Sequence, residues 1–198
     1  DYNGLKMRMP GLGGRTIEKL GATPVLLAGS DVLPSLSSGA VDAAEWICPA
    51  ADLGAGLYQA AKYYYGPGWH EPSTLLDLSM DLASWEKLDS ATQGLIDDMT
   101  KSFNMTVFSR FQAANGPALQ KLLGEHNVQL KQFPDEVLIA LGNAAGEVVS
   151  ERGSINSETK GICNHLLSFR KNIMDWSTKG ESEFARIRNL SFKYPDSV

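Results

Sequence analysis

The residues best suited to chemistry in this 198-residue sequence lie in three short segments, and the first segment contains Arg8. Arg8 falls on the polar side of an alternating apolar stretch, just before Pro10 and Gly11. A guanidinium can hold a carboxylate through two parallel hydrogen bonds, a geometry that lysine cannot reproduce. Arg8 is therefore a candidate carboxylate anchor, although its place beside Lys6 also fits a solvated surface arginine.

The second segment is "VDAAEWICPAADL" at 41–53, which contains the adjacent pair Glu45 and Trp46. Neighbouring side chains on a strand point to opposite faces, so one can enter a cleft while the other offers its backbone carbonyl. A carboxylate oxygen with a carbonyl oxygen suits Na⁺ or Ca²⁺ better than zinc, which prefers nitrogen and sulfur. The alternative is an edge glutamate beside a core tryptophan.

The third segment is "GPGWHEP" at 66–72, where Trp69, His70 and Glu71 lie between Gly-Pro turns. Rigid turns that hold aromatic and acidic groups favour a preformed pocket. His70 suggests a catalytic or metal-binding role, but a lone histidine is more often structural or simply exposed. The other two histidines fall in helical or terminal contexts.

Sequence signatures of enzymes are missing. The chain has no GxSxG, HExxH or Walker motif, and "GLGGR" at 11–15 lacks the spacing and the lysine of a phosphate-binding loop. We therefore expect a protein that is not an enzyme. An α/β enzyme that uses His70 and Glu71 as an acid-base pair on a small acid is kept as an alternative.

Composition excludes several classes of protein. A formal charge of −5 argues against nucleic-acid binding, which needs a basic field, and no apolar run approaches the roughly 18 residues of a membrane span. Residues 1–4 do not read as a signal peptide, so an exported protein would have lost its signal. Cys48 and Cys163 are far apart in sequence, and a bridge between them can be neither assumed nor excluded.

The first third of the chain alternates extended and helical patterns, which predicts an α/β unit with a mainly parallel sheet. Gly21 and Gly39 suit the ends of the first two helices, and Ser30 suits the N-cap of the second. The expected strands are 4–10, 23–29 and 40–47, and the strand at 23–29 is expected to be buried. The expected helices are 14–21, 30–39 and 49–62.

Further along, the pattern becomes mainly helical. Residues 63–88 are expected to cross between parts of the molecule, with a strand at 74–80 and a short helix after it. Apolar spacing predicts helix over 90–127, either as one kinked helix or as two, because Gly116-Pro117 interrupts it. A strand at 128–133, a helix from Pro134-Asp135 to about 151, and a helix at about 156–191 follow.

Three motifs in this order, "GLKMRMPG", "LGATPVLLAGSDVLPSLSSGAVDAAEWICP" and "AKYYYGPGWHEP", resemble the C-terminal part of a TRAP (tripartite ATP-independent periplasmic) transporter solute-binding protein of the DctP type. The resemblance is close over 4–72 and looser beyond. It implies a two-lobed periplasmic binding protein, here without its N-terminal lobe, that closes on a small organic acid and delivers it to a sodium-driven membrane permease.

The resemblance also assigns roles to residues. Arg8 matches the family arginine that binds the ligand's carboxylate. The Glu-Trp pair resembles the subgroup that binds 2-oxo or 2-hydroxy acids with a cation, where Glu45 and the main chain of Trp46 ligate the metal. Glu71 matches a further acidic position, which we assign to the metal, and Trp69 is assigned to the substrate with Arg8, Glu45 and Trp46. His70 stands where the subgroup often has another aromatic residue.

These inferences define the expected organisation. Residues 1–88 are predicted to form the ligand-binding α/β lobe, residues 89–155 a helical and crossover part of it, and residues 156–198 a C-terminal helix and tail that could make a homodimer. The expected cofactor is Na⁺ or Ca²⁺ bound with the acid, and no organic cofactor. A dimerisation fragment without ligand is the last alternative.

Overall fold

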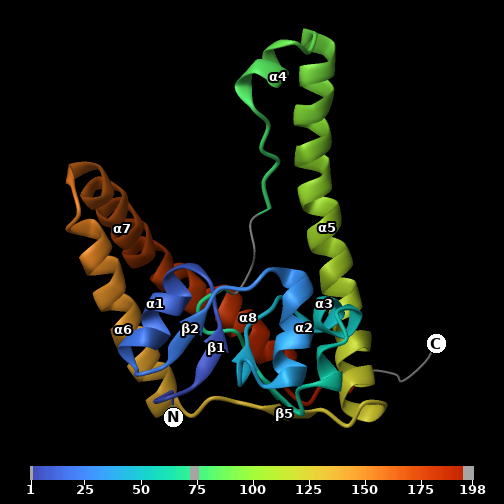
Figure 1. The fold of residues 1–198 in the computed structure, drawn as a ribbon. Helices are drawn as coiled ribbons and strands as arrows, with labels where there is room; N and C mark the ends of the chain where they lie inside the picture. Colours follow the sequence, from blue (N-terminus) through green and yellow to red (C-terminus); the bar gives the residue numbers. More distant parts are fainter. Residues whose placement is uncertain (1, 72–75, 194–198) are drawn as a thin grey trace. The chain divides into compact units, whose positions relative to one another are not determined.

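A computed structural model describes residues 2–71 and 76–193 of the chain, and Figure 1 follows its elements from the N-terminus. The chain forms two compact units, residues 1–144 and 145–198. The first unit holds all five described strands, and the second is helical. The predicted mixed α/β class is confirmed.

The first unit contains a three-stranded parallel sheet of β1 (Lys6–Arg8), β2 (Thr23–Val25) and β3 (Ala43–Ala44) in the order β2-β1-β3. The three predicted strands are therefore present and parallel, but each is shorter than expected. The second of them is not buried as predicted: it lies at one side of the sheet, and Leu26 just after it is 80% exposed.

Two helices connect these strands. Helix α1 (Gly11–Lys19) starts three residues earlier than predicted because Pro10 is already extended and serves as its N-cap. Helix α2 (Gly29–Ser38) ends, as predicted, at Gly39, which has a φ of 73° in the left-handed region. The predicted N-cap role of Ser30 is wrong, because Ser30 lies inside the helix and its hydroxyl donates to Asp31 instead.

The predicted helix at 49–62 is two shorter pieces, α3 (Pro49–Gly54) and the single-turn η1 (Leu57–Gln59). Gly56, at a φ of 70°, breaks the run. A second parallel sheet follows, made of β4 (Tyr63–Tyr65) and β5 (Gln129–Lys131). The strand predicted at 128–133 is thus confirmed. Its partner β4 belongs to the stretch 63–88, which was expected to cross between parts of the molecule.

The strand predicted at 74–80 is wrong over 76–80, which has no regular structure; residues 74 and 75 lie outside the described residues.

After the short α4 (Leu82–Glu86), one 35-residue helix, α5 (Ser90–Gly124), runs through Pro117, so the single-helix alternative is confirmed. Its stripe of Leu95, Met99 and Phe103 is about 60% exposed. Over the described residues, every helix is too short or too polar to cross a membrane.

A small apolar core supports the first sheet. Met9, Ile17 and Ala22 pack with Leu141 from α6 (Asp135–Gly153), the helix predicted to begin after Pro134. Met9 and Ile17 lie at the end of β1 and inside α1, so this core fixes the strand that carries Arg8.

The second unit contains the end of α6, then α7 (Ser157–Lys179) and α8 (Glu181–Arg188). The helical stretch predicted at about 156–191 is confirmed over most of its length, but Gly180 divides it into two helices. Helix α7 begins in a capping box between Asn156 and Thr159. Cys163, like Cys48 in the first unit, is a free thiol, which answers the disulfide question for this structure.

Candidate functional site

The site begins where two neighbouring parallel strands end. Arg8 is the last residue of β1 and pairs in register with Ala44 of β3, so Glu45 follows at the same edge of the sheet. Arg8 Nη1 donates to Glu45 Oε2 at 3.0 Å and to the Glu45 carbonyl at 3.1 Å. Both side chains are mostly buried, at 12% and 15% exposed. The sheet topology therefore joins two of the predicted site residues directly.

Arg8 still has donor capacity toward a ligand. Its Nε is buried and has no hydrogen-bond partner among the described residues. An unpaired buried donor costs about 1–3 kcal/mol, so a partner supplied by a ligand would be favoured. Nε and Nη2 form the side-on edge of a guanidinium, which matches the two oxygens of a carboxylate. The pair with Glu45 uses the other edge, through Nη1.

Burial sets the electrostatics of Glu45. Desolvation raises the pKa of its carboxyl above the ordinary value, the guanidinium of Arg8 lowers it, and the nearby carboxylate of Glu71 raises it again. A cation close to Glu45 would oppose both the desolvation and the repulsion by Glu71. The carboxyl is thus placed where a positive ligand stabilises its ionised form.

Trp46 lies against Arg8, the residue that pairs with Glu45. The guanidinium carbon of Arg8 is 5.2 Å from the centre of a Trp46 ring, a cation–π contact. The indole also covers Gly29 at the start of α2, where an added Cβ would lie 2.6 Å from Cη2 of Trp46. Gly29 is therefore needed for the close approach of this ring. The ring position in turn limits how Arg8 can move.

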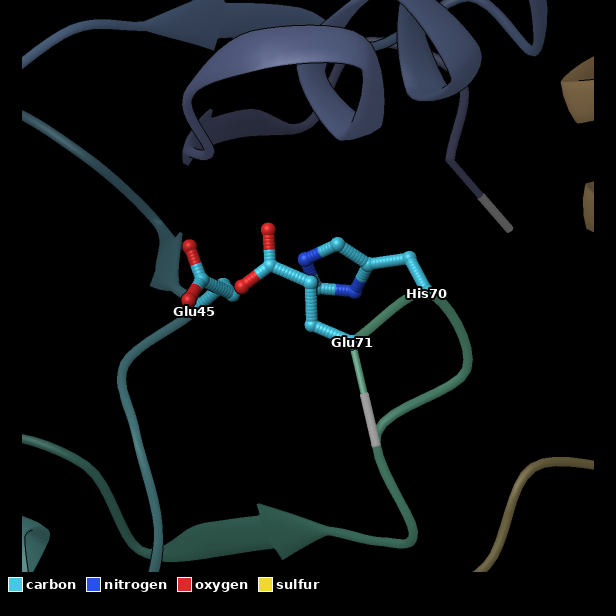
Figure 2. A group of neighbouring side chains, drawn as sticks. All are labelled: Glu45, His70 and Glu71. Carbon is cyan, nitrogen blue, oxygen red and sulfur yellow. The ribbon is translucent and has the colours of Figure 1, made fainter. Parts of the chain in front are cut away.

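Two residues of the 66–71 segment complete the group. Glu45, His70 and Glu71 each offer a ligand atom, and these atoms all lie within 4.8 Å of one another. Figure 2 shows the three side chains directed toward one another, Glu45 from the end of β3 and His70 and Glu71 from the later loop. Burial lowers the pKa of His70, while the charge of Glu71 raises it. The structure thus brings Glu71 to the predicted site, and also His70, which had been named only in the enzyme alternative and not among the ligand or metal residues.

Trp69 is placed differently from the other predicted residues. It is partly buried against the apolar core that includes Met9 and Ile17, and its ring centre lies 4.8 Å from that of His70. It supports the histidine and the core at once. Its assignment to the substrate stays a prediction.

Sequence reasoning missed a buried pair that fixes this segment. Asp52 in α3 is 5% exposed, and its carboxylate accepts hydrogen bonds from the Ile47 N–H and from the Tyr64 hydroxyl of β4. Burial raises the pKa of both Asp52 and Tyr64. Asp52 follows Pro49 in the first turn of a helix, and an acid there is a sequence signal for bonding to preceding backbone N–H groups. Its tyrosine partner has no comparable signal.

Comparison with known proteins identifies the family. Residues 1–154 match DctP, the bacterial extracellular solute-binding protein family 7. This chain belongs to that family. The family consists of binding proteins, so the sequence-based predictions of a DctP-type protein that is not an enzyme are confirmed.

Among curated proteins, this DctP-family chain is 34% identical over 191 residues to the monocarboxylate 2-oxoacid-binding periplasmic protein all3028 of Nostoc sp.. The match covers 96% of this chain and 52% of the Nostoc protein. The chain therefore spans about half the length of the curated relative it matches.

Solved structures of TRAP solute-binding proteins match just as broadly. A Pseudoalteromonas atlantica protein with bound sodium and pyruvate is 29% identical with a TM-score of 0.87, over 96% of this chain and 57% of its own. A Colwellia psychrerythraea protein with bound calcium and pyruvate is 31% identical with a TM-score of 0.86, over 96% and 57%. A Bordetella bronchiseptica dimer with calcium and picolinate is 32% identical with a TM-score of 0.85, over 95% and 56%.

Proposed function

We propose that this DctP-family chain carries the anion-anchoring and cation-binding residues of a TRAP solute-binding protein that captures a small 2-oxo or 2-hydroxy monocarboxylate. The periplasm is its proposed location, and membrane subunits of a TRAP permease are its proposed partners. Pyruvate is the first ligand to test, because it is bound in the Pseudoalteromonas and Colwellia structures.

The observation that carries this proposal is the buried Nε of Arg8, which has no hydrogen-bond partner in the part of the chain that the structure describes. The guanidinium of Arg8 is held in place by Glu45, which bonds to Nη1. This bond leaves the side-on edge, formed by Nε and Nη2, to a ligand. A ligand carboxylate there would gain two charge-assisted hydrogen bonds at a positive centre that is already desolvated. In the proposed complex this carboxylate meets the Nε edge of Arg8.

The proposed cation lies beside the acid. Glu45 would supply a carboxylate oxygen, Trp46 its main-chain carbonyl, and Glu71 a second carboxylate oxygen. A 2-oxo or 2-hydroxy oxygen next to the ligand's own carboxylate would complete a set of hard oxygen donors, which Na⁺ and Ca²⁺ both accept. The acid and the cation then neutralise one another within a mostly buried site.

Calorimetric titration of the full-length protein containing this chain with pyruvate, in Ca²⁺, in Na⁺ and in neither, tests this function. Binding should need one of the cations. Arg8→Lys should weaken pyruvate binding by roughly 100-fold, because it removes the fork and each hydrogen bond to a charged group is worth about 1.5–3 kcal/mol.

Arg15→Lys is the matched control, since Arg15 is well exposed and pairs with Glu18 on the surface of α1. Equal affinity in Arg8→Lys and Arg15→Lys would refute the anchoring role of Arg8. Pyruvate binding that ignores the cation would refute the cation part of the proposal.

The second unit supports a further proposal, that α7 pairs with α7 of a second copy. Ile162, Leu166 and Phe169 share one side of this helix by their spacing, and each is more than half exposed. The Bordetella relative is a dimer.

A further inference from the structure

One part of the first unit exposes apolar side chains that its own fold does not cover. The arm, defined as residues 76–116, consists of the extended run 76–81, helix α4 and most of α5. Gln93 Nε2 of α5 donates to the Trp85 carbonyl of α4 at 2.9 Å, where the two helices meet (Figure 1). No residue of the arm is buried, and the buried residues of α5, Ala118 and Leu122, lie beyond it. The arm thus has no core of its own.

The exposed apolar residues of α5 lie on more than one side of the helix. Leu95, Met99 and Phe103 follow one another in steps of four residues, and each is about 60% exposed. Phe108 lies about two and a half turns beyond Met99, which places it on the opposite side, and it is 55% exposed. A helix that is apolar on opposite sides is typical of a buried core helix, whereas pairing with one other helix would cover a single stripe.

The extended run has the pattern of a half-buried strand. Leu76, Leu78 and Met80 are 65%, 63% and 45% exposed, and a polar residue separates each from the next. Successive side chains of an extended chain point to opposite faces, so these three share one face. No backbone hydrogen bond joins residues 76–80 to another described residue. An apolar face with unused backbone donors and acceptors suits addition to the edge of a sheet.

We propose that the arm forms a second apolar core together with the part of the full-length protein that lies outside these 198 residues. In that core, residues 76–80 pair with the edge of a sheet, and α5 is covered on at least two sides. The arm does not include the anion and cation residues, so the proposal stands whichever acid is bound.

The relatives have the length of chain that such a core needs. The Pseudoalteromonas match covers 96% of this chain, and therefore most of the arm, but only 57% of the longer protein. The Nostoc match covers 52% of that protein, so nearly half of it lies outside the match. A segment of this size is long enough for a domain with its own core. The rest of the same polypeptide is therefore a better occupant than a second copy, which would cover one stripe of α5.

Methionine oxidation in the full-length protein tests the proposal without a variant. Met80 and Met99 of the arm are 45% and 61% exposed in this chain. Met9, at 3%, and Met174 of α7, at 47%, are the slow and fast references. With dilute hydrogen peroxide and peptide mass spectrometry, both arm methionines should react at least about tenfold more slowly than Met174. Reaction of Met80 and Met99 at the rate of Met174 would overturn the proposal.

Dilution identifies the occupant. Protection that persists at concentrations where light scattering shows a monomer supports an occupant in the same polypeptide. Protection that disappears on dilution to the monomer assigns the arm to a second copy and overturns the proposal.

Two neighbouring substitutions in the full-length protein test the strand. Leu78→Asn changes the apolar face, and Ser79→Asn changes the opposite face. Because only Leu78 would be buried, we expect the thermal midpoint to fall by roughly 5 °C in Leu78→Asn and to change by less than about 1 °C in Ser79→Asn. Failure of Leu78→Asn alone to fold also supports burial of this face. Equal midpoints in the two variants would contradict the addition of this strand to a sheet.

Discussion

Tyr64→Phe tests the buried pair that supports the site segment. The substitution removes the hydroxyl that donates to Asp52 and leaves the ring in place. Asp52 is 5% exposed, so water cannot readily replace this donor. A hydrogen bond to a charged group is worth about 1.5–3 kcal/mol, and we expect the free energy of unfolding at pH 7 to fall by about this amount.

The sign of the pH dependence follows from Asp52. Burial raises its folded-state pKa above the ordinary value of 3.8, and the bond from Tyr64 opposes that rise. A carboxyl with a raised folded pKa stabilises the fold at pH below 3.8, and this contribution is lost as the pH rises through the folded pKa. Without the hydroxyl, the folded pKa rises further and the loss extends to higher pH. The difference between the two proteins should therefore be small at acid pH, near the roughly 1 kcal/mol of a neutral hydrogen bond, and largest at neutral pH.

Urea denaturation at pH 4 and pH 7, followed by circular dichroism, measures this difference. Tyr65→Phe is the matched control, because Tyr65 is half exposed and stacks on Phe133 through its ring. Equal stability of Tyr64→Phe and Tyr65→Phe at pH 7 would refute the role of the pair. A larger difference at pH 4 than at pH 7 would refute the assignment of the charge to Asp52.

Three further predictions concern the site and the second unit. Gly29→Ala should lower pyruvate affinity at least tenfold by displacing the indole of Trp46, whereas Gly54→Ala, where an added Cβ meets nothing within 4 Å, should leave calorimetric affinity unchanged. Because its pKa is raised, Glu45 takes up a proton at a higher pH than an ordinary carboxyl does. The proton competes with Ca²⁺ for this carboxylate, so Ca²⁺ affinity measured by dye competition should fall up to about tenfold per pH unit below that pKa. Phe169→Glu should shift the protein from dimer to monomer in light scattering; an unchanged mass would refute pairing through α7.

Much of the first unit could be predicted from local signals. Gly39 ends a helix because the left-handed backbone suits glycine, and the alternation through Met7 and Met9 marks the strand that contains Arg8. The parallel arrangement of these strands was predicted, and Arg8 and Glu45 meet because β1 and β3 are parallel neighbours that end at the same edge. These features depend on short sequences and on topology rules.

What sequence reasoning missed depends on contacts between distant segments. His70 joins Glu45 only because of the path of the 66–71 turn, which no periodicity encodes. Asp52 and Tyr64 meet through the second sheet, whose two strands are more than sixty residues apart in the sequence. Tertiary packing decided each of these cases.

The continuity of α5 also has a mechanical consequence. Asn115 Oδ1 accepts a hydrogen bond from the N–H of Ala50, at the start of α3 and five residues after Glu45. Residues 90–116 extend about 40 Å from Pro117 at the α-helical rise, so a bend of about 5° there would displace Ser90 by roughly 3.5 Å. With such a bend the helix would act as a lever whose pivot, near Asn115, is hydrogen-bonded to the segment that follows Glu45 and Trp46. A small shift of that segment would be magnified at the far end of the helix.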